Sequence, residues 1–439
     1  MILIESNCSR TSNLGDEAIL SYNLRLLKNT KINEVIVISP LPKVTSTLHR
    51  VKCIPSFYVL IDGNNRRTRN LRALWLAFKL LFNAWRVKRA KNPILLKPIE
   101  LKFLHAFHKC KAFLIVGGGI MRSSACFFSS NASGLFPKCI EILIAKIFGK
   151  PVFVGAQTIG PFEIGNLCSL WGKMLTRFAL NKVDVLTVRE HYSKRLLQKI
   201  GVKGNIKVVV DEAFNAETVD SERAEKLLYA ENLDIKKLRR EGKLVVGVSL
   251  RAWTMVNERK TLRKKLLKVL ETLSKDRQHH FVFIPTHASR HLPRIIKVVE
   301  KVVTSKVEPE RCTFISNPYT WQEIKSFFGL MDAVIAVSFH SAVFSLSTNI
   351  PTLGLYEGEY YHMKMKGLFN LVGLSNFALD ASTEKAEKIL SKFKELITRK
   401  EEIKKFLIEK KPILQRSCGY AVKKLIEHLA EGKKEEADE

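Results

Sequence analysis

The sequence has few cysteines, and no two of them stand at the spacing of a metal or redox motif. The absence of a Cys-x-x-Cys pair disfavours a zinc knuckle and a dithiol redox site. Isolated cysteines in apolar stretches are typical of buried thiols in a reducing compartment. The eight positions are Cys8, Cys53, Cys110, Cys126, Cys139, Cys168, Cys312 and Cys418.

Long apolar runs are also missing. No uninterrupted apolar stretch approaches the roughly 20 residues that a membrane-spanning helix needs. The first residues, Met1 to Ser6, lack the basic region and the cleavable apolar core of a signal peptide, and they read as a strand instead. We therefore expect a cytoplasmic protein.

Acidic residues are scarce relative to basic ones. The 439 residues include 73 Lys and Arg against 42 Asp and Glu, which gives a formal net charge of +31. This excess predicts anionic partners, either phosphorylated small molecules, an acidic membrane surface or nucleic acid. Nucleic acid is the least favoured of the three because the sequence carries no recognition motif. With 46% hydrophobic residues, the chain is globular and long enough for two domains.

Short β-branched runs alternate with helical patterns along most of the chain. This alternation indicates an α/β fold with parallel sheets and crossover helices. Strands are expected at residues 2–5, 34–38, 112–116, 151–155, 183–188, 207–210, 244–250, 280–285, 312–315, 333–337 and 352–355. The simplest interpretation is two Rossmann-like domains, 1–215 and 244–382, with a helical linker over 216–243. Helices and a polar tail are expected over 383–439.

Residues 66–98 interrupt the α/β pattern, within an expected insertion over 64–110. Basic residues flank Leu, Phe, Trp75 and Trp85 there, and no acidic residue stands among them. Lys79 interrupts the apolar stretch, so we expect no bilayer-spanning helix. A basic amphipathic helix with aromatic anchors can lie in the interface of an anionic membrane, which would place the protein peripherally at the inner face. The same pattern fits an insertion packed on its own domain.

Glycine follows several predicted strands. Gly117 to Gly119 come after one strand, and the run Gly155 to Pro161 begins at the end of another. Ligands of open parallel sheets bind beyond the carboxyl ends of the strands, where glycine lets backbone amides approach an anion. The loop containing Asn13, Gly15 and Asp16 follows the first strand and opens a helix, of which Asp16 is the expected N-cap.

These segments and several later ones together resemble the polysaccharide pyruvyl transferase family over roughly residues 2–375. The matching motifs are Asn13 to Ile19, Val116 to Gly119, Gly155 to Pro161, Val188 to Glu190 with Ser193, Asp211, Gly247 to Arg251, Ile284 to His287, and Ser338 to His340. The resemblance implies a fold like that of the two-domain GT-B glycosyltransferases, with an active site in the interdomain cleft. It also implies phosphoenolpyruvate as donor and a pair of hydroxyls on a lipid-linked or polymeric sugar as acceptor, giving a pyruvate ketal.

The implied chemistry assigns roles to individual residues. Phosphoenolpyruvate carries a phosphate and a carboxylate, and Arg251 at the end of a strand could clamp either anion. The methylene carbon of the donor must be protonated, and His340, which follows the strand 333–337, is the expected general acid. A dianionic substrate would favour its protonated form. No metal and no cofactor are expected.

Further residues are expected to line the site. Donor-binding roles are assigned to Lys364, Ser338 and His287, in addition to Arg251. Contacts with the acceptor or with the cleft are assigned to Asn13, Gly15, Asp16, Gly118, Gly119, Gln157 and Arg189.

The sequence departs from the family at Ser338, where the family usually has Arg. A hydroxyl cannot hold an anion as a guanidinium does, although Ser338 can cap the helix that begins near His340. Either Lys364 or Lys366 supplies the missing charge, or the donor differs, or activity has been lost. The alternatives are therefore a GT-B glycosyltransferase that uses a nucleotide-sugar and a non-catalytic glycan- or anion-binding relative.

Overall fold

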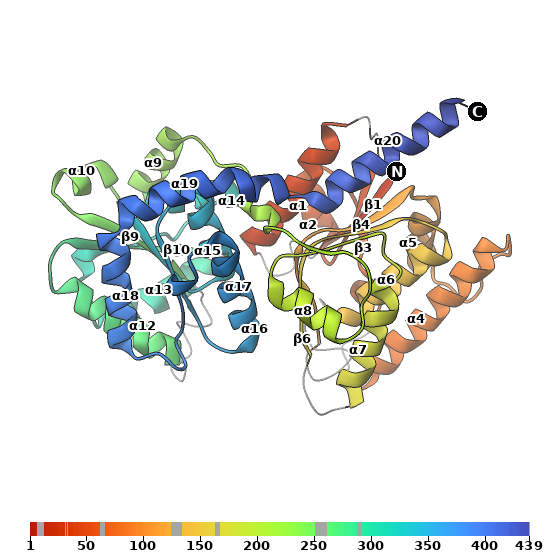
Figure 1. Ribbon diagram of the computed structural model, residues 1–439, viewed down its shortest axis with the longest axis horizontal. Coiled ribbons are helices and arrows are strands. Elements are labelled where there is room, and N and C mark those ends of the chain that lie inside the picture. The colour runs from red at the N-terminus through yellow and green to blue at the C-terminus, as the bar shows by residue number, and fades with distance from the viewer. Residues whose placement is uncertain are drawn as a thin grey trace. The chain divides into compact units, whose positions relative to one another are not determined.

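The chain forms two compact units, each built around one parallel sheet. The computed structural model describes residues 1–6, 13–30, 32, 34–61, 66–123, 134–162, 167–250, 261–287 and 291–438. The first unit comprises residues 1–10, 19–212 and 419–439, and the second comprises 11–18 and 213–418 (Figure 1). In these described ranges, no helix combines the length and the apolar character that crossing a membrane requires.

The first sheet has the strand order β3-β2-β1-β4-β6-β7-β8, with β5 paired beside β6. Every ladder between these strands is parallel, and the order reverses between β1 and β4. The strands are β1 (Ile2–Glu5), β2 (Val35–Ser39), β3 (Lys52–Pro55), β4 (Ala112–Ile115), β5 (Gly118–Ser123), β6 (Val152–Phe162), β7 (Val185–Val188) and β8 (Ile206–Val208).

Helices bury this sheet, as expected for parallel strands whose two faces are both apolar. Phe107 packs between Phe103 and Phe113 in the core, with ring centroids 5.1 and 4.9 Å away in tilted and edge-to-face arrangements. The C-terminal helix packs on β4, β6 and β7. The helices are α1 (Leu14–Lys28), α2 (Pro42–His49), α3 (Phe57–Leu60), α4 (Arg66–Lys88), α5 (Pro98–Lys109), α6 (Leu135–Ile147), α7 (Leu167–Leu180), α8 (His191–Lys199) and α20 (Tyr420–Asp438). The first turn of α1 is grouped with the second unit.

The second sheet has the order β11-β10-β9-β12-β13-β14, which is that of a doubly wound Rossmann fold. The strands are β9 (Leu244–Leu250), β10 (His279–Pro285), β11 (Cys312–Phe314), β12 (Ala333–Ala336), β13 (Thr352–Tyr356) and β14 (Ala378–Asp380). The strand order reverses between β9 and β12. In sheets of this kind, ligands bind beyond the carboxyl ends of the strands at that reversal.

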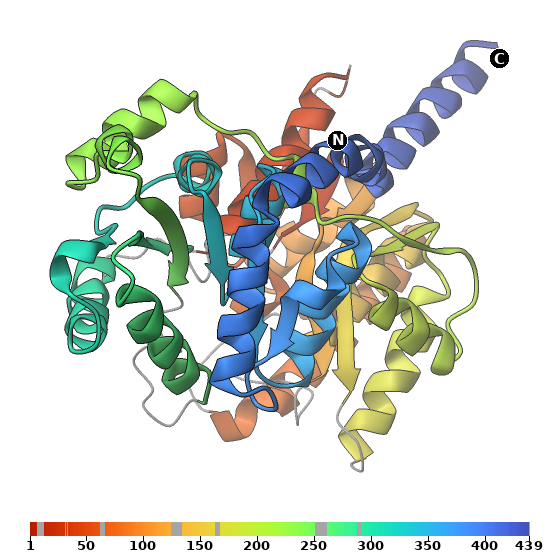
Figure 2. The ribbon, with the colours of Figure 1, turned by 60° about the vertical axis from the view of Figure 1, so that its left-hand side comes forward.

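Figure 2 shows the helices that accompany the strands of the second sheet. They are α9 (Ser221–Ala230), α10 (Ile235–Arg240), α12 (Thr261–Ser274), α13 (Leu292–Thr304), α14 (Trp321–Gly329), α15 (Phe339–Ser347), α16 (Glu359–Tyr361), α17 (Gly367–Val372), α18 (Ala386–Thr398) and α19 (Lys400–Ser417). Short turns of other helix types complete the unit: η1 (Glu212–Asn215), η2 (Pro309–Arg311), the π-helical η3 (His362–Lys366) and η4 (Ser375–Phe377).

The expected α/β fold with two Rossmann-like sheets is confirmed, and each expected strand is present with its ends shifted by a few residues at most, apart from β6. The glycine runs differ from expectation. Residues 155–161 continue β6 instead of forming a loop, and Gly118 begins a strand, β5, instead of a turn. The strands β3, β5 and β14 were not predicted.

The helical segments also differ in detail from the sequence-based expectation. The charged stretch 221–242 is two helices, α9 and α10, because Asn232 takes a left-handed conformation between them and Asp234 starts a new helix as N-cap. Residues 419–439 were assigned to a C-terminal helical segment, whereas their contacts group them with the first unit.

Candidate active site

In the second unit, polar side chains gather where the strand order reverses. The hydroxyl of Ser249, near the end of β9, accepts hydrogen bonds from the backbone amides of Val337 (2.8 Å) and Ser338 (3.2 Å), which follow β12. Ser338 then caps α15, because its Oγ accepts from the amide of Ser341 at 3.3 Å. The expectation that Ser338 is a helix cap is confirmed. Its side chain is nearly buried and also contacts the hydroxyl of Thr286 at 3.2 Å.

His340 is the second residue of α15, so its ring lies at the amino-terminal end of that helix. Only 6% of the residue is exposed. The ring packs against Phe339 and Phe344, with centroid distances of 5.3 and 6.4 Å. Its Nδ1 lies 3.2 Å from Oδ1 of Asn13.

The loop that begins with Asn13 comes from the other end of the chain and docks on β10. Asn13 forms an isolated antiparallel bridge with His287, and the amide of Leu14 donates to the carbonyl of Thr286 at 3.2 Å. These contacts explain why residues 11–18 are grouped with the second unit. The structure therefore brings the predicted residues Asn13, His287 and His340 together.

Asn13, not Asp16, is the N-cap of α1. The Asn13 carbonyl accepts from the amides of Asp16 (3.1 Å) and Glu17 (3.2 Å), and its side-chain Oδ1 accepts from the amide of Gly15 (3.2 Å). The prediction that Asp16 is the N-cap is therefore wrong. Asp16 lies in the first turn, where a carboxylate still interacts favourably with the positive end of the helix dipole.

The contacts of Asn13 fix the orientation of the histidine. A carboxylate accepts hydrogen bonds and does not donate them, so Asn13 must point its Nδ2 at Oδ2 of Asp16, at 3.0 Å. Its Oδ1 then faces His340, and Nδ1 of the ring must be the donor. The Asp16–Asn13–His340 chain thus holds the proton on Nδ1 and directs Nε2 away from Asn13.

Gly15 is required by the position of this ring. A Cβ atom built on Gly15 would lie 1.9 Å from Cγ of His340, and two further ring atoms would lie within 2.3 Å. Only glycine lets the start of α1 approach the imidazole so closely. The sequence-based expectation placed Gly15 in the site, and the structure gives it this packing role.

The two lysines considered as replacements for the family arginine differ in environment. Nζ of Lys364 lies 4.9 Å from the ring centroids of both Phe339 and Tyr360. Phe339 directly precedes His340 in α15. Lys366 instead donates to the backbone carbonyls of Ser375 and Ala378, and burial lowers the pKa of its ammonium. Lys364 is therefore the better placed of the two to meet an anion.

The other two predicted donor-binding residues are His287 and Arg251. His287 places Nδ1 3.4 Å from the hydroxyl of Thr286, at the end of β10. Arg251 lies outside the described residues, two positions after Ser249.

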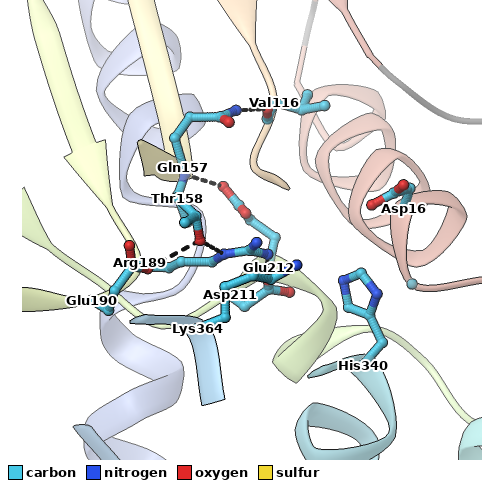
Figure 3. A network of polar contacts seen from close by, with 12 residues as sticks. Asp16, Val116, Gln157, Thr158, Arg189, Glu190, Asp211, Glu212, His340 and Lys364 are labelled. Atoms are coloured by element: carbon cyan, nitrogen blue, oxygen red, sulfur yellow. Dashed lines mark hydrogen bonds and ion pairs between the residues drawn. The ribbon is translucent and has the colours of Figure 1, made fainter. Parts of the chain in front are cut away.

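In the first unit, Arg189 is part of a buried network. Its Nη1 donates to Asp211 at 2.6 Å and its Nε donates to the hydroxyl of Thr158 at 2.7 Å, as Figure 3 shows. Thr158 in turn donates to Glu190 at 3.2 Å. Both partners of the Arg189–Asp211 pair are almost fully buried, and together with the bond to Thr158 this pair connects β6, the end of β7 and the chain after β8. A contact between Arg189 and the acceptor remains a prediction.

Glu212 occupies the space left by two glycines of the predicted loops. Its Oε1 accepts from the amide of Ala156 at 3.0 Å, and a Cβ on Gly117 or Gly155 would approach the carboxylate to 1.9 or 2.7 Å. Those glycines were expected to admit an anionic ligand, whereas here the group beside them is the chain's own carboxyl. Burial, reinforced by the charge of Asp211, raises the pKa of Glu212 to about 7.

The other predicted residues of the first unit lie nearby. Gln157 is buried and its Nε2 donates to the carbonyl of Val116. Gly118 has a φ of +142°, which favours glycine, and Gly119 is half-buried. Their contact with an acceptor remains a prediction. Within the described ranges, no group of three or more His, Cys, Asp or Glu side chains is arranged to hold a metal ion.

Solved structures share the overall architecture. A glycosyltransferase from Rickettsia africae has a TM-score of 0.55 at 13% identity, with 99% of this chain and 97% of that chain covered. A UDP-GlcNAc 2-epimerase from Neisseria meningitidis gives 0.55 at 13%, with 98% and 99% covered. A UDP-GlcNAc 2-epimerase from Methanocaldococcus jannaschii gives 0.52 at 13%, with 90% and 92% covered. The fold is therefore a two-domain α/β fold of the GT-B type.

The family follows from the sequence. The model of the family described as polysaccharide pyruvyl transferase matches residues 13–359, which is most of the chain. This protein belongs to that family and is a transferase by membership. A search of curated proteins finds no significant match.

Sequence reasoning missed several residues that build the site. Ser249 and Thr286 were noted only as parts of longer motifs, although their hydroxyls join the strand ends to Ser338. Glu212 was not singled out, and its position next to Asp211 was the available signal.

Proposed function

We propose that this protein transfers a pyruvyl group from phosphoenolpyruvate to two hydroxyls of a lipid-linked or polymeric sugar. Membership of the pyruvyl transferase family supports a transferase in polysaccharide synthesis. The observation that carries the proposal is the Asp16–Asn13–His340 chain, because it orients a histidine at a helix start beside the strand-order reversal.

His340 acts as general acid in this scheme. With Nδ1–H committed to Asn13, the imidazolium presents its second proton at Nε2 and delivers it to the methylene carbon of the donor. The cationic C2 is attacked by the first sugar hydroxyl, whose proton returns to Nε2. The C2–phosphate bond breaks, the second hydroxyl adds to C2, and its proton leaves with the phosphate. One sugar and one phosphoenolpyruvate thus give one ketal and one hydrogen phosphate.

The donor anions meet positive charge from three sources in the proposed site. Lys364, over the Phe339 ring, supplies one ammonium, and the amino-terminal end of α15 adds the partial positive charge of its helix dipole. Arg251 supplies the guanidinium that clamps phosphate or carboxylate. Ser338 keeps the helix start in place instead of holding the donor.

The test is release of phosphate from phosphoenolpyruvate in the presence of a panel of glycans. His340→Ala should lower kcat by about 10²–10⁴-fold, the range typical of a lost general acid. Lys364→Met should mainly raise KM for phosphoenolpyruvate. The exposed His105→Ala and Lys102→Met on α5 are matched controls and should behave as wild type. Stabilisation of the protein by UDP but not by phosphoenolpyruvate would instead select a nucleotide-sugar glycosyltransferase.

An exchange of two side chains tests the positioning role of Asn13. Asn13→Asp alone places two carboxylates 3.0 Å apart and should lower kcat. Adding Asp16→Asn restores a donor facing an acceptor, with an oxygen still facing His340, and should recover most of the lost kcat. If the exchanged pair is no better than the single variant, the hydrogen-bonded chain is not what orients His340.

A further inference from the structure

One face of α4 exposes a row of aromatic side chains. Trp75, Phe78, Phe82 and Trp85 follow each other at helical spacing, and their exposed fractions are 54%, 58%, 37% and 41%. Successive rings stack with centroids 5.7, 5.9 and 6.3 Å apart. A continuous apolar surface of this kind on a globular protein indicates an interaction site.

The opposite face of α4 already makes the contacts that hold the helix on its own unit. Ala73, Leu76, Ala77 and Leu80 are buried, and the helix packs on α5 and α6. Lys79, which interrupts the apolar stretch in the sequence, is withdrawn into a buried ion pair with Glu100. The aromatic row is therefore a second apolar face, beyond what folding of the unit uses.

A second helix carries a similar row. On α7, Leu170, Trp171, Met174 and Phe178 recur at helical spacing and each is more than half exposed. Both α4 and α7 pack on α6, and Figure 1 shows them in the same unit. We name the eight exposed side chains Trp75, Phe78, Phe82, Trp85, Leu170, Trp171, Met174 and Phe178 the aromatic face.

The charged residues of the two helices that carry the aromatic face have one sign. Neither α4 nor α7 contains an acidic residue. Arg89 lies 4.2 Å from the Trp85 ring centroid, Arg86 lies 5.8 Å from that of Phe82, and Lys182 lies 4.7 Å from that of Phe178. Cationic heads on long apolar stems beside aromatic rings match an interface between hydrocarbon and anionic headgroups.

We propose that the aromatic face docks in the interface of a bilayer containing anionic phospholipid. A second copy of the chain fits less well, because apposing two such faces would bring positive charges together without compensation. An anionic bilayer supplies both requirements at once, hydrocarbon for the rings and phosphate for Arg and Lys. The inference is independent of the pyruvyl transfer proposed above.

The test is co-sedimentation of the full-length protein with vesicles of phosphatidylcholine alone or mixed with phosphatidylglycerol. Wild type should bind the mixed vesicles at least about tenfold more strongly than the neutral ones. Phe78→Glu combined with Phe178→Glu should lower binding to the mixed vesicles by at least about tenfold. Tyr229→Glu combined with Ile408→Glu is the matched control, because both residues are exposed but lie on α9 and α19, and it should bind as wild type.

Several results would overturn the proposal. Equal recovery of wild type with neutral and anionic vesicles would do so, as would equal loss of binding in the control variant. Binding that Phe78→Glu with Phe178→Glu leaves intact would show that charge alone is responsible. A wild-type dimer in light scattering that ignores vesicles and dissociates in the Phe78→Glu and Phe178→Glu variant would assign the aromatic face to self-association. Because the altered residues are exposed, circular dichroism should show unchanged helix content in every variant.

Discussion

Gly15→Ala offers a direct test of the geometry around His340. The added Cβ would lie 1.9 Å from Cγ of the ring, whereas carbon atoms pack at about 3.5 Å, so the imidazole or the start of α1 must move by roughly 1.6 Å. A misplacement of about 1 Å at a reacting group costs on the order of 100-fold in rate. We therefore expect phosphate release to fall by at least about 100-fold.

The same substitution has a stability readout that does not depend on the substrate. Alanine is favoured over glycine in a helix by up to about 1 kcal/mol, but overpacking against a buried ring costs about 1–3 kcal/mol. Denaturant unfolding should show a destabilisation by Gly15→Ala in the wild-type background. In the His340→Ala background the clash is absent, and Gly15→Ala should be neutral or stabilising. The difference between the two backgrounds isolates the contact.

Additivity in this cycle would refute the reasoning. If Gly15→Ala changes stability equally with and without the His340 ring, the two residues do not touch as described. Full activity of Gly15→Ala would lead to the same conclusion, because a displaced imidazole cannot protonate the donor at the normal rate.

Three further substitutions test the interior and the cap. Burial raises the pKa of Glu212 from 4.5 to about 7, so between these pH values the folded state keeps a proton that the unfolded chain releases. The stability that this proton contributes is complete below pH 4.5. It is lost, by up to about 3 kcal/mol, as the pH rises through 7. Glu212→Gln should remove that loss in urea unfolding at pH 5 and pH 8, and an unchanged pH dependence would contradict it. Asp211→Asn removes this ion pair from the buried Arg189 and should cost about 3–5 kcal/mol, seen as a lower Tm in calorimetry. An unchanged Tm would mean that the pair does not hold the strands together. Ser338→Ala should cost about 1 kcal/mol through the lost helix cap and leave KM for phosphoenolpyruvate unchanged; a large rise in KM would give Ser338 a donor contact.

The sequence was most informative where local patterns decide structure. Alternating β-branched runs and helical periods are local, and they located the strands that form the centres of both sheets. The strands that were missed carry weaker signals. β3 and β14 are short edge strands, and β5 begins with glycines that read as a turn. β6 runs through residues 155–161 because β5 pairs with it from Gln157 onward and β7 pairs with it as far as Gln157, which no local pattern reports.

In the candidate site, too, the sequence identified some features and not others. His340 and Asn13 could be identified from the sequence because they are polar residues that follow predicted strands. The order of the motifs along the chain indicated the family. The sequence could not tell that Asn13 caps α1 in place of Asp16. Both are good caps, and the choice depends on the docking of Asn13 against Thr286 and His287.

By itself, the sequence determined the α/β class, the two sheets, the family and the excess of positive charge. Periodicity, composition and motif order can all be read along the chain without knowing which distant residues meet. Tertiary structure alone decided which distant groups meet. It set Gly15 against His340 and placed the carboxyl of Glu212 beside Gly117. It also paired Lys79 with Glu100 in the interior, which leaves the aromatic row of α4 uninterrupted. Such pairings join residues far apart in the chain, and only packing of the complete units selects among them.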